Sequence, residues 1–88
     1  MASVFTDPRL AYEGVMNEEL DVKGLACPLP VLKAKKRLKA MAADDVLTVH
    51  ATDSSAVKDF AAFCELTGHA LLSSTEYEGI YTFELRRA

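Results

Sequence analysis

The stretch GLACPLPVLKAKKRLKAM, residues 24–41, decides the fold because a strand ends and a helix begins within it. Gly24 breaks the short apolar run before it. Pro28 and Pro30 fit the first turn of a helix, where backbone N–H groups have no intrahelical partner. Cys27 therefore lies at, or one residue before, a helix N-terminus. The free N–H groups and the positive end of the helix dipole stabilise a thiolate there, so this position predicts an activated thiol.

Apolar periodicity places further elements on both sides of this stretch. Both helices directly follow strands, so right-handed crossovers put them on the same face of one sheet. The order βαβαββ predicts an α/β (α+β) two-layer sandwich with a four-stranded mixed sheet. The predicted elements are strands at 18–22, 46–51, 69–75 and 80–86, a helix at 28–42, and a helix that follows a cap at 53–55 and ends at Gly68.

Each predicted helix carries an apolar stripe that should face the sheet. Cys64 lies on the second stripe, which predicts a core residue rather than a second reactive thiol. The stripes are Val31, Ala34, Leu38 and Met41 in the first helix, and Val57, Phe60, Ala61 and Cys64 in the second.

The length of 88 residues is that of one domain. Residues 1–17 have no clear apolar period and are expected to form a flexible extension, which leaves 18–88 as the domain. The net charge of −3 argues against a nucleic-acid coat protein. No secretory signal or membrane-length apolar run is visible, and two cysteines are too few for a disulfide scaffold. We therefore expect a cytoplasmic, monomeric protein.

Positive charge is concentrated in one segment. Residues 28–41 carry +5 and no acid, which leaves −8 on the rest of the chain. Lys33, Lys35 and Lys36 form either an ordinary solvated helix face or a docking strip for an acidic partner. A docking strip would raise association rates and make them salt-sensitive.

The residues around Cys27 restrict its chemistry. The chain has no C-x-x-C pair, no histidine near Cys27 in sequence and no metal-ligand spacing, so a dithiol, a Cys–His hydrolase and a metal site are weakly supported. One accessible thiolate suffices to attack an activated sulfur, which favours a carrier of persulfide sulfur that needs no cofactor. Asp21 either hydrogen-bonds the Cys27 loop or ends the strand, and Gly24 should supply a positive φ.

The motif around Cys27 resembles the TusA/SirA-type sulfurtransferase signature. The resemblance covers about residue 20 to the end and includes the Thr52-Asp53 turn and the stretch 59–64. Leu29 departs from the acid that tRNA-thiolation members carry at this variable position, so the pathway stays open. The matching residues are Asp21, Gly24, Leu25, Cys27, Pro28 and Pro30, followed by Lys33, Lys35 and Lys36.

The resemblance implies a sulfur carrier that takes sulfane sulfur as a persulfide on Cys27 and passes it to another protein thiol. The implied donors are a cysteine desulfurase, a rhodanese or a DsrE-type protein. Whether such a carrier counts as an enzyme in its own right stays open. Two alternatives remain: a non-catalytic interaction or regulatory module that uses the basic helix, and a redox protein that forms a Cys27–Cys64 disulfide.

Overall fold

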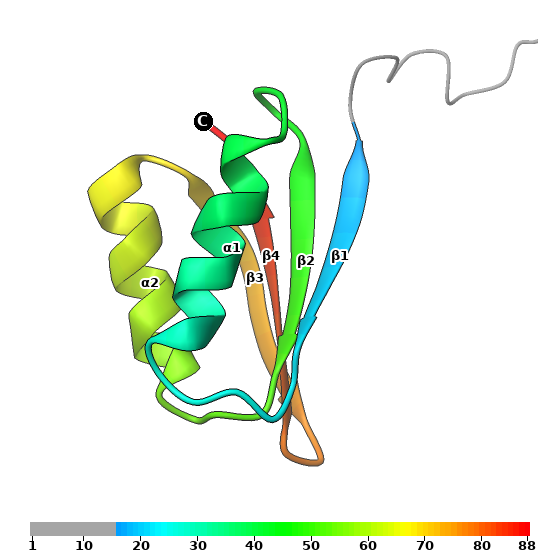
Figure 1. Ribbon diagram of the computed structural model, residues 1–88, viewed down its shortest axis with the longest axis vertical. Helices are drawn as coiled ribbons and strands as arrows, with labels where there is room; N and C mark the ends of the chain where they lie inside the picture. The colour runs from blue at the N-terminus through cyan, green and yellow to red at the C-terminus, as the bar shows by residue number, and fades with distance from the viewer. Residues whose placement is uncertain (1–15) are drawn as a thin grey trace, which may run out of the picture.

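Two helices cover one face of a four-stranded sheet (Figure 1). The computed structural model describes residues 16–88. The strand order is β1-β2-β4-β3, with β1 and β2 parallel and the other neighbouring pairs antiparallel. The predicted βαβαββ two-layer sandwich is confirmed. The elements are β1 (Asn17–Val22), α1 (Leu29–Lys39), β2 (Val46–Ala51), α2 (Ala56–Thr67), β3 (Ala70–Tyr77) and β4 (Ile80–Arg86).

The strands agree closely with the alternation in the sequence. β2 and β4 have the predicted bounds, and β3 is shifted to Ala70–Tyr77 from the predicted 69–75. Glu78 and Gly79 join β3 to β4 with φ values of 50° and 80°. Two positive φ values suit a two-residue hairpin turn, because this backbone twist matches that of the flanking strands. Residues 1–15 of the expected extension lie outside the described residues.

The core lies between the helices and the sheet. Alternate residues of β2, Leu47, Val49 and Ala51, are fully buried because every second side chain of a strand points to the same face. The Phe60 ring of α2 stacks on the Phe83 ring of β4, with the ring centroids 4.7 Å apart. Phe60 and Phe83 are the largest fully buried side chains, so this contact fixes α2 against the sheet.

α1 is shorter than predicted but turns the expected side to the core. It ends at Lys39 rather than at residue 42. Ala34, Leu38 and Met41 are buried as expected, whereas Val31 is only partly buried. Pro30 in the first turn is also buried, so the proline that starts the helix also packs against the core.

The predicted stripe of α2 is partly wrong. Phe60 and Cys64 are buried, but Val57 and Ala61 are exposed. Ala56 and Phe63 complete the buried face in their place. The sequence AVKDFAAFC has apolar residues around most of the helix, so two stripes have helical spacing, and packing of Phe60 on the sheet selects one of them. Gly68 ends the helix with a φ of 84°, as predicted for a C-terminal glycine.

Asp45 ties the start of β1 to the start of β2. Its side chain is nearly fully buried, and its Oδ1 accepts a hydrogen bond from the Met16 N–H at 2.9 Å. The Arg87 N–H donates to the Asp45 carbonyl at 2.8 Å. The described part of the chain therefore begins and ends beside the start of β2, whereas the loop between β1 and α1 leaves the opposite end of β1 (Figure 1). Cys27 lies in that loop.

Candidate functional site: the Cys27 loop and its groove

Cys27 is exposed in the loop that connects β1 to α1. Pro28 is the cap residue of α1, so Cys27 lies one residue before the cap, within the range that the sequence predicted. Gly24 has a φ of +84°, a conformation that favours glycine, and this confirms its expected backbone role. The loop closes through a hydrogen bond from the Leu29 N–H to the Ala26 carbonyl at 2.9 Å.

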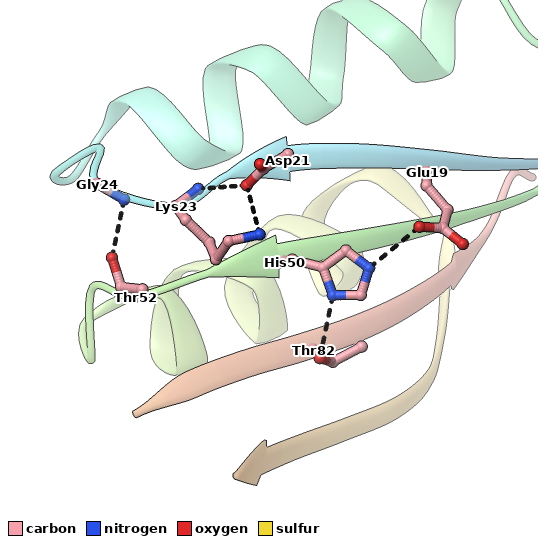
Figure 2. Close-up of polar contacts among 7 residues, drawn as sticks. All are labelled: Glu19, Asp21, Lys23, Gly24, His50, Thr52 and Thr82. Carbon is pink, nitrogen blue, oxygen red and sulfur yellow. Dashed lines mark hydrogen bonds and ion pairs between the residues drawn. The ribbon is translucent and has the colours of Figure 1, made fainter. Parts of the chain in front are cut away.

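The loop between β2 and α2 fastens the Cys27 loop at two points. The Cys27 N–H donates to Asp53 Oδ2 at 2.6 Å. The Gly24 N–H donates to Thr52 Oγ1 at 2.9 Å (Figure 2). Asp53 Oδ1 also accepts from the Ser55 N–H at 3.1 Å, so one carboxylate holds both the thiol loop and the start of α2. These backbone hydrogen bonds lower the pKa of Asp53.

Asp53 was missing from the predicted site residues. The sequence indicated only a possible cap of the second helix, because Asp before a helix is a common cap. The Thr52-Asp53 turn, which is part of the family resemblance, was the one available signal.

Asp21 acts at the start of the Cys27 loop. Its Oδ1 accepts a hydrogen bond from the Lys23 N–H at 2.9 Å and lies 3.1 Å from Lys23 Nζ (Figure 2). The contacts with Lys23 lower the pKa of Asp21. Asp21 therefore shapes the turn that leaves β1, while Asp53 makes the direct contact with Cys27.

The charged groups near Cys27 are acidic, whereas the sequence predicted a positive helix end that stabilises a thiolate. Hydrogen bonding with the Asp59 carboxylate raises the pKa of the Cys27 thiol, and desolvation and the charges of Asp59 and Asp53 act in the same direction. A hydrogen bond with Ser55 opposes them. The surroundings of Cys27 therefore raise the pKa of its thiol, opposite to the direction that the sequence predicted.

Two features of α1 explain why its N-terminus does not lower the pKa of the Cys27 thiol. Pro28 and Pro30 have no N–H, and the Leu29 N–H is already bonded to Ala26. The Leu32 N–H donates to the Pro28 carbonyl at 3.1 Å. The first turn therefore offers few free donors to a sulfur anion. The two prolines that mark the helix start also remove the groups that would stabilise a thiolate.

An apolar groove of about 300 Å³ opens beside Cys27. The walls come from the start of α1 and from one side of α2. Leu66 is 87% exposed on this rim, an unusual exposure for a leucine. Asp59 is the ionisable side chain that shares the groove with the thiol. Neither was predicted as a site residue, because the side that α2 presents to the groove depends on how Phe60 packs. The lining residues are Cys27, Pro28, Val31, Asp59, Ala62, Phe63 and Leu66.

The three predicted docking lysines are exposed but do not form one strip. Lys33 and Lys36 line a hollow of about 370 Å³ beside Leu20 of β1. Lys35 lines a smaller hollow on the α2 side of α1. Arg37, which shares the first hollow, forms an ion pair with Glu18 at 3.1 Å. None of the lysines lines the Cys27 groove.

Both cysteines are free, and their surroundings differ. Cys64 is 5% exposed, which confirms the prediction that it is a core residue. Burial raises the pKa of its thiol. A Cys27–Cys64 disulfide would therefore have to join an exposed loop cysteine to a buried helix cysteine.

Neither histidine lines the Cys27 groove. The His50 Nδ1 atom lies 3.3 Å from Thr82 Oγ1, and its Nε2 atom lies 3.4 Å from Glu19 Oε1 (Figure 2). These three side chains lie on the sheet face opposite the helices. His69 Nδ1 accepts a hydrogen bond from the Ala88 N–H at 2.9 Å. Within residues 16–88 no cluster of metal-ligating side chains occurs, and no helix is long and apolar enough to span a bilayer.

Comparison with known proteins gives a consistent result. The family described as Sulfurtransferase TusA matches residues 18–87. The chain is 58% identical over 66 residues to a protein of Neisseria meningitidis serogroup A, an alignment that covers 75% of this chain and 89% of the other. It is 49% identical over 72 residues to the sulfur carrier protein TusA of Allochromatium vinosum, covering 82% of this chain and 95% of that protein.

The fold also has a solved counterpart. The crystal structure of a SirA-like protein from Desulfitobacterium hafniense superimposes with a TM-score of 0.72 at 25% sequence identity. The match covers 78% of this chain and 95% of that one. The motif around Cys27, the βαβαββ sandwich and the match over residues 18–87 agree, and the chain belongs to the sulfurtransferase TusA family.

Proposed function

We propose that this protein is a sulfur carrier that accepts sulfane sulfur as a persulfide on Cys27 and relays it to the thiol of another protein. The observation that carries the proposal is an exposed cysteine, fixed through its own N–H by Asp53, at the edge of an apolar groove. Family membership and relatives named as sulfur carriers support the same role.

The geometry fits a relay better than self-contained catalysis. Within residues 16–88, no second thiol and no histidine line the groove with Cys27. A persulfide on Cys27 would therefore have no neighbouring thiol to attack it, and the sulfur would stay until another protein supplies one. The groove gives that protein an apolar surface beside the sulfur.

A donor and an acceptor are the partners that this chemistry requires. The donor must present a persulfide whose outer sulfur can reach Cys27, as a cysteine desulfurase, a rhodanese or a DsrE-type protein does. The acceptor must present a free thiol. Pro28, Val31 and Leu66 would contact the protein segments that flank those sulfurs.

Intact-mass measurement tests the proposal. The protein is incubated with a cysteine desulfurase and cysteine, and we expect a gain of one sulfur atom that a reductant removes. Cys27→Ser should lose the adduct, and Cys64→Ser, the matched control, should keep it. An adduct that persists in Cys27→Ser would show that the sulfur is carried elsewhere.

A further inference from the structure

Asp59 is the acidic side chain that lines the groove with Cys27. It lies in the first turn of α2, where its N–H donates to the Ser55 carbonyl at 3.1 Å, and its side chain is half-buried. Within residues 16–88, no Lys, Arg or His nitrogen forms an ion pair with Asp59. The carboxylate therefore shares the groove with the thiol and has no ion-pair partner among the described residues.

Sulfur transfer to a protonated thiol requires a group that accepts the thiol proton. Thiolates, not thiols, attack sulfur. Hydrogen bonding with Asp59 raises the pKa of the Cys27 thiol, which favours its protonated form in the free protein. The thiol proton must therefore leave as the new sulfur–sulfur bond forms, and some group in the groove must accept it.

We propose that Asp59 is the acid–base residue of sulfur transfer at Cys27, an inference that rests on the proposed function. Cys27 Sγ attacks the outer sulfur of the donor persulfide while its proton moves to the Asp59 carboxylate. The Sγ–S bond forms, the S–S bond of the donor breaks, and its electron pair leaves on the donor cysteine sulfur. Asp59 then returns the proton to that thiolate. A thiol and a persulfide thus exchange places, with no outside oxidant or reductant.

The other ionisable groups near Cys27 are less suited to this role. Both Asp53 oxygens already accept backbone hydrogen bonds, from Cys27 and from Ser55. Those bonds lower the pKa of Asp53, which makes it a weaker base. α1 contributes Pro28 and Val31 to the groove, neither of which is ionisable. Asp59 is thus the acid of α2 that lines the groove, and no backbone N–H of the described residues donates to its carboxylate.

The test compares two reactions of Cys27 in Asp59→Asn. One is alkylation by iodoacetamide across pH, which reports the thiolate without a partner. The other is single-turnover sulfur uptake from a cysteine desulfurase that has been loaded with persulfide and freed of cysteine. At pH 7 we expect alkylation to become several-fold faster, because the carboxylate no longer opposes the thiolate. Uptake should become at least about tenfold slower, since general acid–base groups contribute about 10²–10⁴-fold.

Opposite signs in these two reactions distinguish the proposal from simpler roles. If uptake is unchanged or rises together with alkylation, Asp59 only suppresses the thiolate and the proposal is overturned. Alkylation that slows or stays the same also overturns it. Asp59→Glu should restore uptake in part, and Glu65→Gln, the same charge change on the exposed side of α2, should alter neither reaction.

The wild-type protein supplies a test that needs no variant, should Asp59→Asn fail to fold. Below the thiol pKa, alkylation should fall about tenfold per pH unit with the thiolate fraction. Uptake should fall less steeply than alkylation over this pH range, because the carboxylate accepts the proton of the neutral thiol. Uptake that falls in parallel with alkylation overturns the role of Asp59 and leaves the carrier function intact. Failure of the wild type to take up sulfur at all overturns the carrier function instead.

Discussion

The two cysteines have raised pKa values for different physical reasons. In the Cys27 loop the cause is an acidic neighbour, chiefly Asp59, next to an exposed sulfur. In α2 the cause at Cys64 is burial. A neighbouring charge can be changed by a partner or by one substitution, whereas burial changes only when the helix opens. The comparison indicates that a partner can change the reactivity of Cys27, whereas Cys64 stays unreactive while α2 is folded.

The largest effect that we expect is in native alkylation. Iodoacetamide should modify Cys27 at least about 10³-fold faster than Cys64, because Cys64 reacts only after α2 opens, and opening of core elements approaches a global stability of about 5–15 kcal/mol. Peptide mass mapping over time measures both rates. Comparable alkylation rates at Cys27 and Cys64 in the native protein would contradict their difference in burial. Denaturant should make the two rates similar.

Loosening the core should weaken the protection of Cys64. Phe60→Ala removes the ring stacked on Phe83, and we expect it to lower the free energy of unfolding by about 3–5 kcal/mol. Leu66→Ala serves as the control, since an exposed side chain should change stability by less than about 0.5 kcal/mol. Urea denaturation measures both values. A destabilisation of the same size in both variants would contradict the placement of Leu66 on the groove rim.

The pH dependence of stability should report the Asp53 contacts. The pKa of Asp53 is lowered in the folded state, so its contribution to stability is present above the unfolded pKa of about 3.9 and is lost as pH falls through the folded value. Asp53→Asn removes this contribution. Its destabilisation relative to wild type should therefore be larger at pH 7 than at pH 3, as measured by denaturation at both values. An equal difference at both pH values would show that the charge of Asp53 does not hold the loop.

The smallest effect concerns the lysines, which lie outside the Cys27 groove. The double variant Lys33→Glu, Lys36→Glu should associate with an acidic sulfur donor about 2–10-fold more slowly at low salt. The difference from wild type should disappear in roughly 0.5 M salt, because the ions screen long-range attraction between charges. Stopped-flow association rates measure the effect. Lys58→Glu, on the exposed side of α2, is the matched control. A loss that persists at high salt would indicate a direct contact instead of long-range attraction.

Local patterns in the sequence were sufficient for the fold. Alternation predicted the bounds of β2 and β4, and Gly68 predicted the end of α2. The prolines predicted Cys27 at, or one residue before, a helix N-terminus, and it lies one residue before the cap of α1. Each of these features depends on a few consecutive residues, which explains why they could be read without tertiary structure.

The electrostatics of the site could not be predicted in the same way. Asp53 and Asp59 are 26 and 32 positions after Cys27, and they reach it only because β1 and β2 are parallel neighbours that bring both loops to the same end of the sheet. Whether Asp59 lies in the groove also depends on the rotation of α2 about its axis. The sequence allowed two rotations, because apolar residues around the helix form two possible stripes. Asp45 read as a turn residue, although its buried carboxylate anchors β1.

The placement of the last residue has a practical consequence for single-molecule and surface experiments. Ala88 follows β4 beside the start of β2, at the end of the sheet opposite the Cys27 loop. A fluorescent label or an immobilisation tether joined after Ala88 would therefore point away from the sulfur. The tethered protein could exchange sulfur with a flowing donor, and its loading could be followed one turnover at a time.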